Sequence, residues 1–148
     1  MWVGILAILA ISIVLFLSRR RKSSRIKAYH VLLKELEGLE KVDNASVGTR
    51  SSSIIKRALQ LYFPEKDFLA LSASEIEMFL QEDNAKDQTT EIRELAKLLT
   101  KLEHSRFSGN TATGIESIPV ITRLIRTITA SLQREEKRGK RPSPDKLP

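Results

Sequence analysis

The chain has 148 residues and a net charge of +7, and it contains no cysteine. Without cysteine there can be no disulfides, thiolate chemistry or cysteine-based zinc sites. The positive charge lies at the ends: residues 19–27 hold six basic and no acidic side chains, whereas residues 31–133 hold 13 basic and 15 acidic ones. A slightly acidic middle is not typical of a nucleic-acid-binding domain, and we expect no nucleic-acid partner.

Residues 1–18 predict a transmembrane anchor. Residues 2–17 are apolar apart from Gly4 and Ser12, and as a helix they span about 24 Å, which flanking residues can extend to the hydrocarbon thickness. Trp2 stands where an interfacial aromatic anchor belongs. No basic residue precedes Arg19 and no small-x-small cleavage site follows the apolar run, so an uncleaved anchor is favoured over a secretory signal peptide.

Residues 19–27 predict a basic collar beside the membrane. Because nearby positive charge follows the anchor and none precedes it, the positive-inside rule places the C-terminal domain in the cytoplasm and the N-terminus outside. In a bacterium the chain would be a single-pass protein of the cell inner membrane. The collar has two interpretations that can hold together, a topology determinant and a contact with anionic lipid headgroups. The residues expected to contact membrane lipid are Trp2, Arg19, Arg20, Arg21, Lys22, Arg25 and Lys27.

The 3.6-residue period predicts the first two helices of the domain. Residues 24–41 form the first, and nothing between residues 18 and 27 decides whether it continues the membrane helix. Residues 42–52 are expected to form a polar loop. The second helix covers residues 53–63 and ends before Pro64. Apolar side chains mark the expected buried faces, Ile26, Tyr29, Leu33, Leu36 and Leu39 in the first helix and Ile54, Ile55, Ala58, Leu59 and Tyr62 in the second.

A capping box predicts where the third helix begins. The Ser72 hydroxyl can accept a hydrogen bond from the third helical amide, while the Glu75 carboxylate accepts one from the cap amide. Residues 83–90 are expected to form a loop. A fourth helix follows over residues 91–107, with Leu99 in its buried face and Gly109 as its stop.

Pro119 predicts the first turn of a fifth helix, where a missing amide costs nothing. The tail, residues 137–148, is basic and has almost no apolar side chain to bury, so we expect it to be disordered. The predicted fold is all-α: one N-terminal transmembrane helix and a helical domain over residues 28–136, a small bundle of about five helices. The buried face of the fifth helix is expected at Ile118, Ile121, Leu124, Ile125, Ile128 and Leu132.

The sequence shows no constellation that carries chemistry. His30 and His104 are the only histidines, and neither has a second ligand at metal-binding spacing. The carboxylates stand at helix-surface spacings beside lysines, and no glycine-rich loop follows a strand. We therefore predict no catalytic, cofactor-binding or metal-binding residue, no cofactor and no enzyme activity.

Arg106 and Phe107, followed by Ser108 and Gly109, form the most distinctive short motif. An aromatic residue at a helix end, before a glycine stop, usually packs the following loop onto the core, and this interpretation is favoured. The alternative is that Arg106 and Phe107 contact a protein partner, since exposed aromatic and arginine side chains often dominate binding energy.

The order of these elements resembles a known family. The resemblance rests on the anchor, the arginine run and four segments, LLKELEGLE from Leu32, IIKRALQLYFP from Ile54, LSASEIEMFL from Leu71 and LAKLLTKLEHSRFSG from Leu95. Together they are similar to small helical domains encoded in bacterial operons with MoxR-type AAA+ ATPases and von Willebrand factor A proteins, and to cytoplasmic tails of Bat-type aerotolerance proteins. The resemblance implies an accessory membrane subunit whose partner is such an ATPase or von Willebrand A protein.

Two functions follow as hypotheses. The first is a membrane-tethered helical adaptor in a bacterial inner-membrane complex. The second is an anionic-lipid-responsive regulator at the membrane surface, in which the basic collar is the working part.

Overall fold

A computed structural model describes residues 2–39, 41, 44–82, 88–109 and 112–139. Within these residues the chain forms five helices and no strand, which confirms the all-α prediction. The helices are α1 (Trp2–Leu39), α2 (Asn44–Tyr62), α3 (Ala73–Gln81), α4 (Thr90–Phe107) and α5 (Ala112–Gly139).

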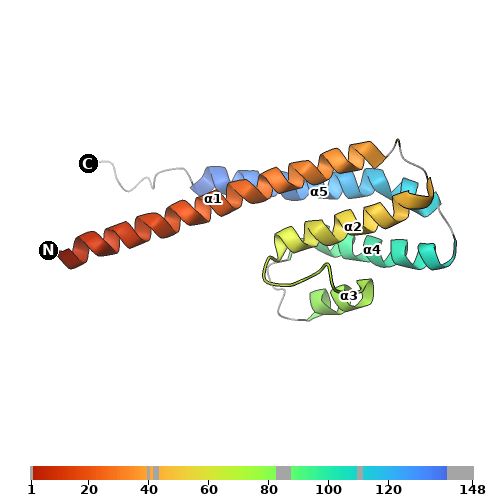
Figure 1. The fold of residues 1–148 in the computed structure, drawn as a ribbon, viewed down its shortest axis with the longest axis horizontal. Coiled ribbons are helices and arrows are strands. Elements are labelled where there is room, and N and C mark those ends of the chain that lie inside the picture. Colours follow the sequence, from red (N-terminus) through yellow and green to blue (C-terminus); the bar gives the residue numbers. More distant parts are fainter. Residues whose placement is uncertain (1, 40, 42–43, 83–87, 110–111, 140–148) are drawn as a thin grey trace.

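Four of the helices form an antiparallel bundle (Figure 1). Helices α1, α2, α4 and α5 alternate in direction, and each packs on its neighbours in chain order, with α5 closing the bundle against α1. Helices α2 and α5 also touch across the centre, and α3 packs on the outer side of α4. The N-terminal half of α1 extends well beyond the other helices (Figure 1).

The core is a single cluster of apolar side chains to which all five helices contribute. Leu99 has no exposed surface, as its place in the periodic pattern predicts. Leu32 of α1 is buried where Leu33 was expected, and Leu33 is only half-buried. Largest among the fully buried side chains are Tyr29, Phe68, Leu32, Leu36, Ile55, Leu59, Ile76, Ile92, Leu95, Leu99, Leu102 and Ile121.

Polar contacts join α1 to α2. The buried Tyr29 hydroxyl donates to the carbonyl of Ala58 at 2.9 Å, which satisfies a group that would be costly to bury alone. Burial raises the pKa of Tyr29 far above its ordinary value, so the phenol stays neutral. On the surface, Arg57 Nη1 lies 2.6 Å from Glu35 Oε2.

Helix α1 decides whether the first predicted helix of the domain continues the N-terminal one. It runs without interruption from Trp2 to Leu39, so the predicted helix at residues 24–41 is the continuation of the N-terminal one. The described chain therefore has five helices in all, not five after a separate N-terminal helix.

Helix α2 starts nine residues before the predicted position, so the expected loop at residues 42–52 is wrong from Asn44 onward. The extra turns bury Val47, Ser51 and Ser52, and Ser52 Oγ donates to the Gly48 carbonyl at 3.0 Å. Most of these side chains are small or polar, so the spacing of apolar residues does not predict a helix here.

Helix α5 also starts early, so Pro119 lies inside it and not in its first turn. Pro119 has no amide hydrogen to donate to the Ile115 carbonyl. Both residues are exposed, so water can donate to this carbonyl instead. The preceding turns are held by packing on α2: a Cβ at Gly114 would lie 3.0 Å from the backbone nitrogen of Gly48. At the other end α5 continues to Gly139, so residues 137–139 are helical, contrary to the predicted tail. The rest of that tail lies outside the described residues.

Helix α3 begins at the predicted capping box. The Glu75 amide donates to Ser72 Oγ at 3.3 Å, and the Ser72 amide donates to Glu75 Oε2 at 2.8 Å. Lys56 of α2 fixes the preceding turn, because its ammonium donates to the Leu71 carbonyl at 2.8 Å and lies 3.4 Å from Glu103 of α4. The short helix is therefore positioned from both of its neighbours in sequence.

Candidate interaction site

Phe107 is the most exposed large apolar side chain of the described residues, with 92% of its surface open. It is the last residue of α4. Two carbonyls of the last turn of α4 accept hydrogen bonds from Ser108: the Ser108 amide donates to the His104 carbonyl at 3.2 Å, and Ser108 Oγ donates to the Ser105 carbonyl at 3.0 Å. Gly109 then turns the chain with a φ of 72°, which glycine adopts without steric cost. The hydrogen-bonded end of α4 thus leaves the Phe107 ring open to solvent.

The favoured interpretation of Phe107, an aromatic that packs its loop onto the core, is wrong. The buried stripe of α4 runs through Leu95, Leu99 and Leu102, and the same spacing continues to Arg106, not to Phe107. The Arg106 stem takes that place against α2, where a Cβ at Gly48 would lie 3.7 Å from its Cγ. The Phe107 ring, one residue further along, lies outside the buried arc of α4. Arg106 packs only part of its stem against α2, and the residue as a whole is exposed.

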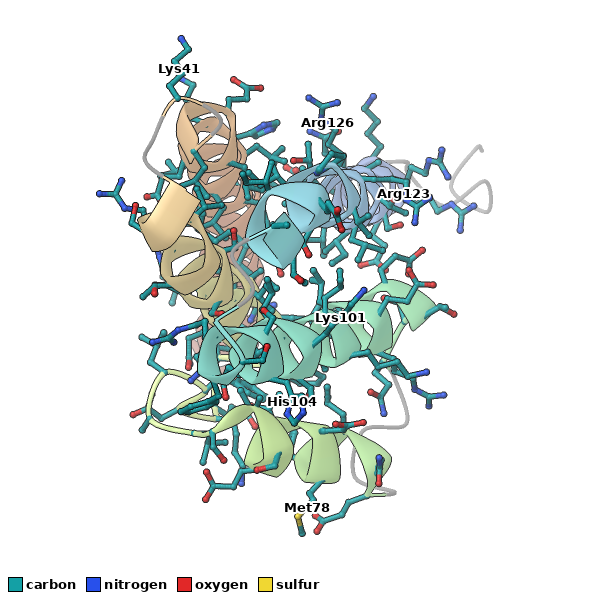
Figure 2. The ribbon with its side chains drawn as sticks, turned by 90° about the vertical axis from the view of Figure 1, so that its right-hand side faces the viewer. Lys41, Met78, Lys101, His104, Arg123 and Arg126 are labelled. Carbon is teal, nitrogen blue, oxygen red and sulfur yellow. The ribbon has the colours of Figure 1, made fainter. Side chains whose placement is uncertain are left out.

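A second surface, which the sequence interpretation missed, runs along α4. Two open hollows share Glu77 and Lys97: one of about 290 Å³ lies between α3 and α4, and another of about 430 Å³ reaches His104 and Thr113. Their α4 rim carries the exposed basic side chains Arg93, Lys97, Lys101 and His104. The spacing of four residues from Arg93 to Lys101 could have revealed this stripe. Figure 2 shows Lys101 and His104 on α4 and Met78 on α3 below.

Neither histidine lies in a metal-binding arrangement. Among the described residues no group of three His, Asp or Glu side chains could hold a metal ion. His30 and His104 are both exposed, on α1 and α4. The side chains that line the two hollows can therefore make polar and basic contacts, and among the described residues they form no metal-binding group.

Of the described groups, Glu75 and Tyr29 have a perturbed pKa, and neither lines the hollow beside Lys101. The pKa of Glu75 is lowered, first by hydrogen bonds from the Ser72 hydroxyl and amide. The pKa of Tyr29 is raised by burial in the α1–α2 contact. Both shifts come from contacts that hold helices in place.

The residues predicted to contact lipid all lie on α1. Arg25 is half-buried and Lys27 is exposed, whereas the side chains of Trp2, Arg19, Arg20, Arg21 and Lys22 lie outside the described set. Among the helices in the described part of the chain, none is both long and apolar enough to cross a membrane. The predicted transmembrane anchor is thus not confirmed.

The geometry defines a class first: a small antiparallel α-helical bundle with an extended first helix and an exposed aromatic at one end. Residues 1–135 match a family described as a domain of unknown function (DUF4381), and the chain belongs to this family. No curated protein matches the chain. No solved structure matches it either.

Proposed function

We propose that this protein is a membrane-tethered helical adaptor, in which α1 anchors the chain and the bundle presents Phe107 to a protein partner. The observation that carries the proposal is the 92% exposure of a large aromatic ring at a closed helix end. A ring that is almost fully exposed adds little to the packing of the bundle, whereas aromatic anchors dominate many protein–protein interfaces. Arg106 beside it adds a second side chain of the type enriched at binding hot spots.

The tether is supported by the sequence. Residues 2–17 are apolar apart from Gly4 and Ser12, and a run of basic residues follows directly. Such a segment is typical of a single-pass anchor whose basic side stays in the cytoplasm. Phe107 is then far from the bilayer, because α4 ends at the opposite end of the bundle from the N-terminal half of α1 (Figure 1).

The partner class comes from the sequence resemblance alone. A MoxR-type AAA+ ATPase or a von Willebrand factor A protein of a bacterial inner-membrane complex would dock on the Phe107 end of the bundle. The basic collar then orients and tethers the domain.

The proposal is tested by replacing Phe107 with a photo-cross-linking amino acid in cells that express the full chain. We expect a specific cross-linked protein, identified by mass spectrometry after detergent extraction of the membranes. Phe107→Ala should weaken co-purification of that protein by about 30-fold, the effect of losing a hot spot of about 2 kcal/mol.

Leu69→Ala is the matched control. Leu69 is also exposed, at 55%, but it lies in the α2–α3 connection, so its loss should leave co-purification unchanged. Both variants should keep the circular dichroism of the parent chain. Equal capture by the parent chain and Phe107→Ala would refute the adaptor surface at this position.

A further inference from the structure

The last turns of α5 carry a basic cluster without an assigned role. Arg134, Lys137 and Arg138 are exposed, and at 100° per residue they share one face of the helix. Glu135 lies to one side of that face, and Glu136, half-buried, lies behind it. The packed residues Ile125, Ile128 and Thr129 are on the opposite side of α5, so the basic face points away from the core.

The packing register brings this cluster level with the C-terminal end of the collar: Lys137 and Arg138 lie level with residues 26 and 25 of α1, and Arg134 with residue 29. Helices α1 and α5 are antiparallel neighbours, and Arg126 Nη2 lies 3.8 Å from Glu37 Oε1. Twelve residues further along α5 is Arg138, and twelve residues back along α1 is Arg25. Since both helices rise by about 1.5 Å per residue, each step covers about 18 Å in the same direction. Figure 1 shows the end of α5 alongside the middle of α1, beyond the ends of α2 and α4.

We propose that the C-terminal turns of α5 form, with the collar of α1, a two-helix contact for anionic lipid headgroups at the membrane surface. This inference rests on the proposed function, because only an anchored α1 brings the collar to the bilayer. Level with the collar, the α5 cluster then meets the same headgroups. Each basic side chain near an anionic surface strengthens such a contact about fivefold.

The partner is a lipid surface because the two neighbouring clusters on α1 and α5 are both basic. The collar holds six basic and no acidic residues, so a second basic cluster at the same level has no opposite charge on α1 to pair with. A single helix can tilt and rotate about its anchor, whereas two basic helices at one level would hold the bundle upright. Phe107, at the far end of the bundle, is then directed away from the membrane.

A fluorescence experiment on the full chain tests the geometry. Because the protein lacks cysteine, Gln133→Cys and Glu116→Cys each give a unique labelling position, both exposed and both on α5. The labelled chains are reconstituted into vesicles of phosphatidylcholine alone or with phosphatidylglycerol, each with a trace of headgroup-nitroxide lipid as quencher. We expect more quenching at position 133 than at position 116, which is about 25 Å further along the helix, and we expect phosphatidylglycerol to increase the quenching at position 133.

Two double variants separate charge from position. Lys137→Gln with Arg138→Gln should lower the phosphatidylglycerol-dependent quenching at position 133 at least fivefold. Arg123→Gln with Arg126→Gln should leave this quenching unchanged. Both arginines are exposed on the same side of α5 and point outward (Figure 2). Their replacement removes the same charge at a position further from the collar. An equal loss of quenching in the two double variants would show that the position of the charges does not matter, and would overturn the proposal.

Flotation of the vesicles distinguishes the two proposals. If the chain floats with the vesicles but position 133 is not quenched, the anchor stands and the α5 contact is refuted. If the chain stays at the bottom of the gradient, the membrane tether fails and the α5 contact fails with it. Quenching that is equally strong on phosphatidylcholine alone would show proximity without headgroup recognition, and would also overturn the proposal.

Discussion

Leu99 has no exposed surface and lies in the stripe that α4 turns toward the core. Leu99→Ala should lower the free energy of unfolding by about 2–5 kcal/mol, because it removes buried methyl groups and leaves a cavity. Denaturant unfolding of the full chain in detergent, followed by circular dichroism, measures the change. Leu69→Ala, at a 55% exposed leucine, should stay within about 0.5 kcal/mol. A comparable loss in the two variants would contradict the core described here.

Gly114 marks the closest approach of α5 to α2. A Cβ at this position would lie 3.0 Å from the nitrogen and 3.2 Å from the Cα of Gly48, and neither backbone atom can rotate away. Gly114→Ala should therefore cost about 1–3 kcal/mol of unfolding free energy. The same unfolding assay measures it.

Gly38 is the matched control for Gly114. It also lies in a helix, but a Cβ there would have nothing within 4 Å. Gly38→Ala should raise the unfolding free energy by up to about 1 kcal/mol, because alanine loses less conformational entropy in a helix. Opposite signs for the two substitutions are the expected result; a stabilised Gly114→Ala chain would mean that α2 and α5 are further apart.

At the scale of elements, α3 depends on its capping box because it is only nine residues long. Hydrogen bonds from Ser72 lower the pKa of Glu75 below its ordinary value of 4.5. A carboxylate with a lower pKa in the folded state stabilises the fold above the unfolded pKa, and this contribution disappears as the pH falls through the folded pKa. The capping box should therefore weaken below about pH 4.5.

Unfolding of the parent chain and of Glu75→Ala at neutral pH and near pH 3 tests this. The parent should be the more stable at neutral pH, and the difference should shrink at pH 3. Ser72→Ala should cost about 1 kcal/mol at neutral pH through the lost cap, and part of that cost should persist in acid because a hydroxyl does not titrate there. A Glu75→Ala difference that does not depend on pH would exclude the charged form of the box.

The connection between α2 and α3 has no regular helix and is held by aromatic side chains. Phe63, Phe68 and Phe79 pack with ring centroids 5.5 to 5.8 Å apart, and the Phe68 amide donates to Gln60 Oε1 at 2.8 Å. Edge and tilted contacts of this kind add stability beyond buried area. They place α3 against the outer side of α4, where the hollow beside Lys97 forms.

At the scale of the molecule, the orientation in the membrane is the central prediction. Six basic residues follow the apolar segment and none precedes it, so the bundle should lie in the cytoplasm. A C-terminal fluorescent fusion should be bright and a C-terminal alkaline phosphatase fusion inactive. Replacement of Arg19, Arg20, Arg21 and Lys22 by glutamine should weaken the preference for a cytoplasmic C-terminus. An active phosphatase fusion to the unaltered chain would show that the topology is the opposite of the one predicted.

The sequence by itself determined that the chain is all-α and most of the buried positions of its helices. The leucine spacing of α4 and the Ser72–Glu75 box are encoded by residues within a few positions of each other, so local physics is sufficient to predict them. The early starts of α2 and α5 could not be predicted in this way, because they depend on the contact of Gly48 with Gly114, 66 residues apart. Phe107 was misjudged for a related reason: it lies only one residue from the buried arc of α4, and the contact of the Arg106 stem with α2 at Gly48 leaves the Phe107 ring outside that arc.

The level of α5 relative to the collar was decided by tertiary structure alone. No sequence pattern states how far one helix slides along another; that register comes from side chains interlocking between elements distant in the chain. Basic residues at the two ends of the sequence look unrelated when read along it. They come to one level only because α1 and α5 are antiparallel and packed side by side.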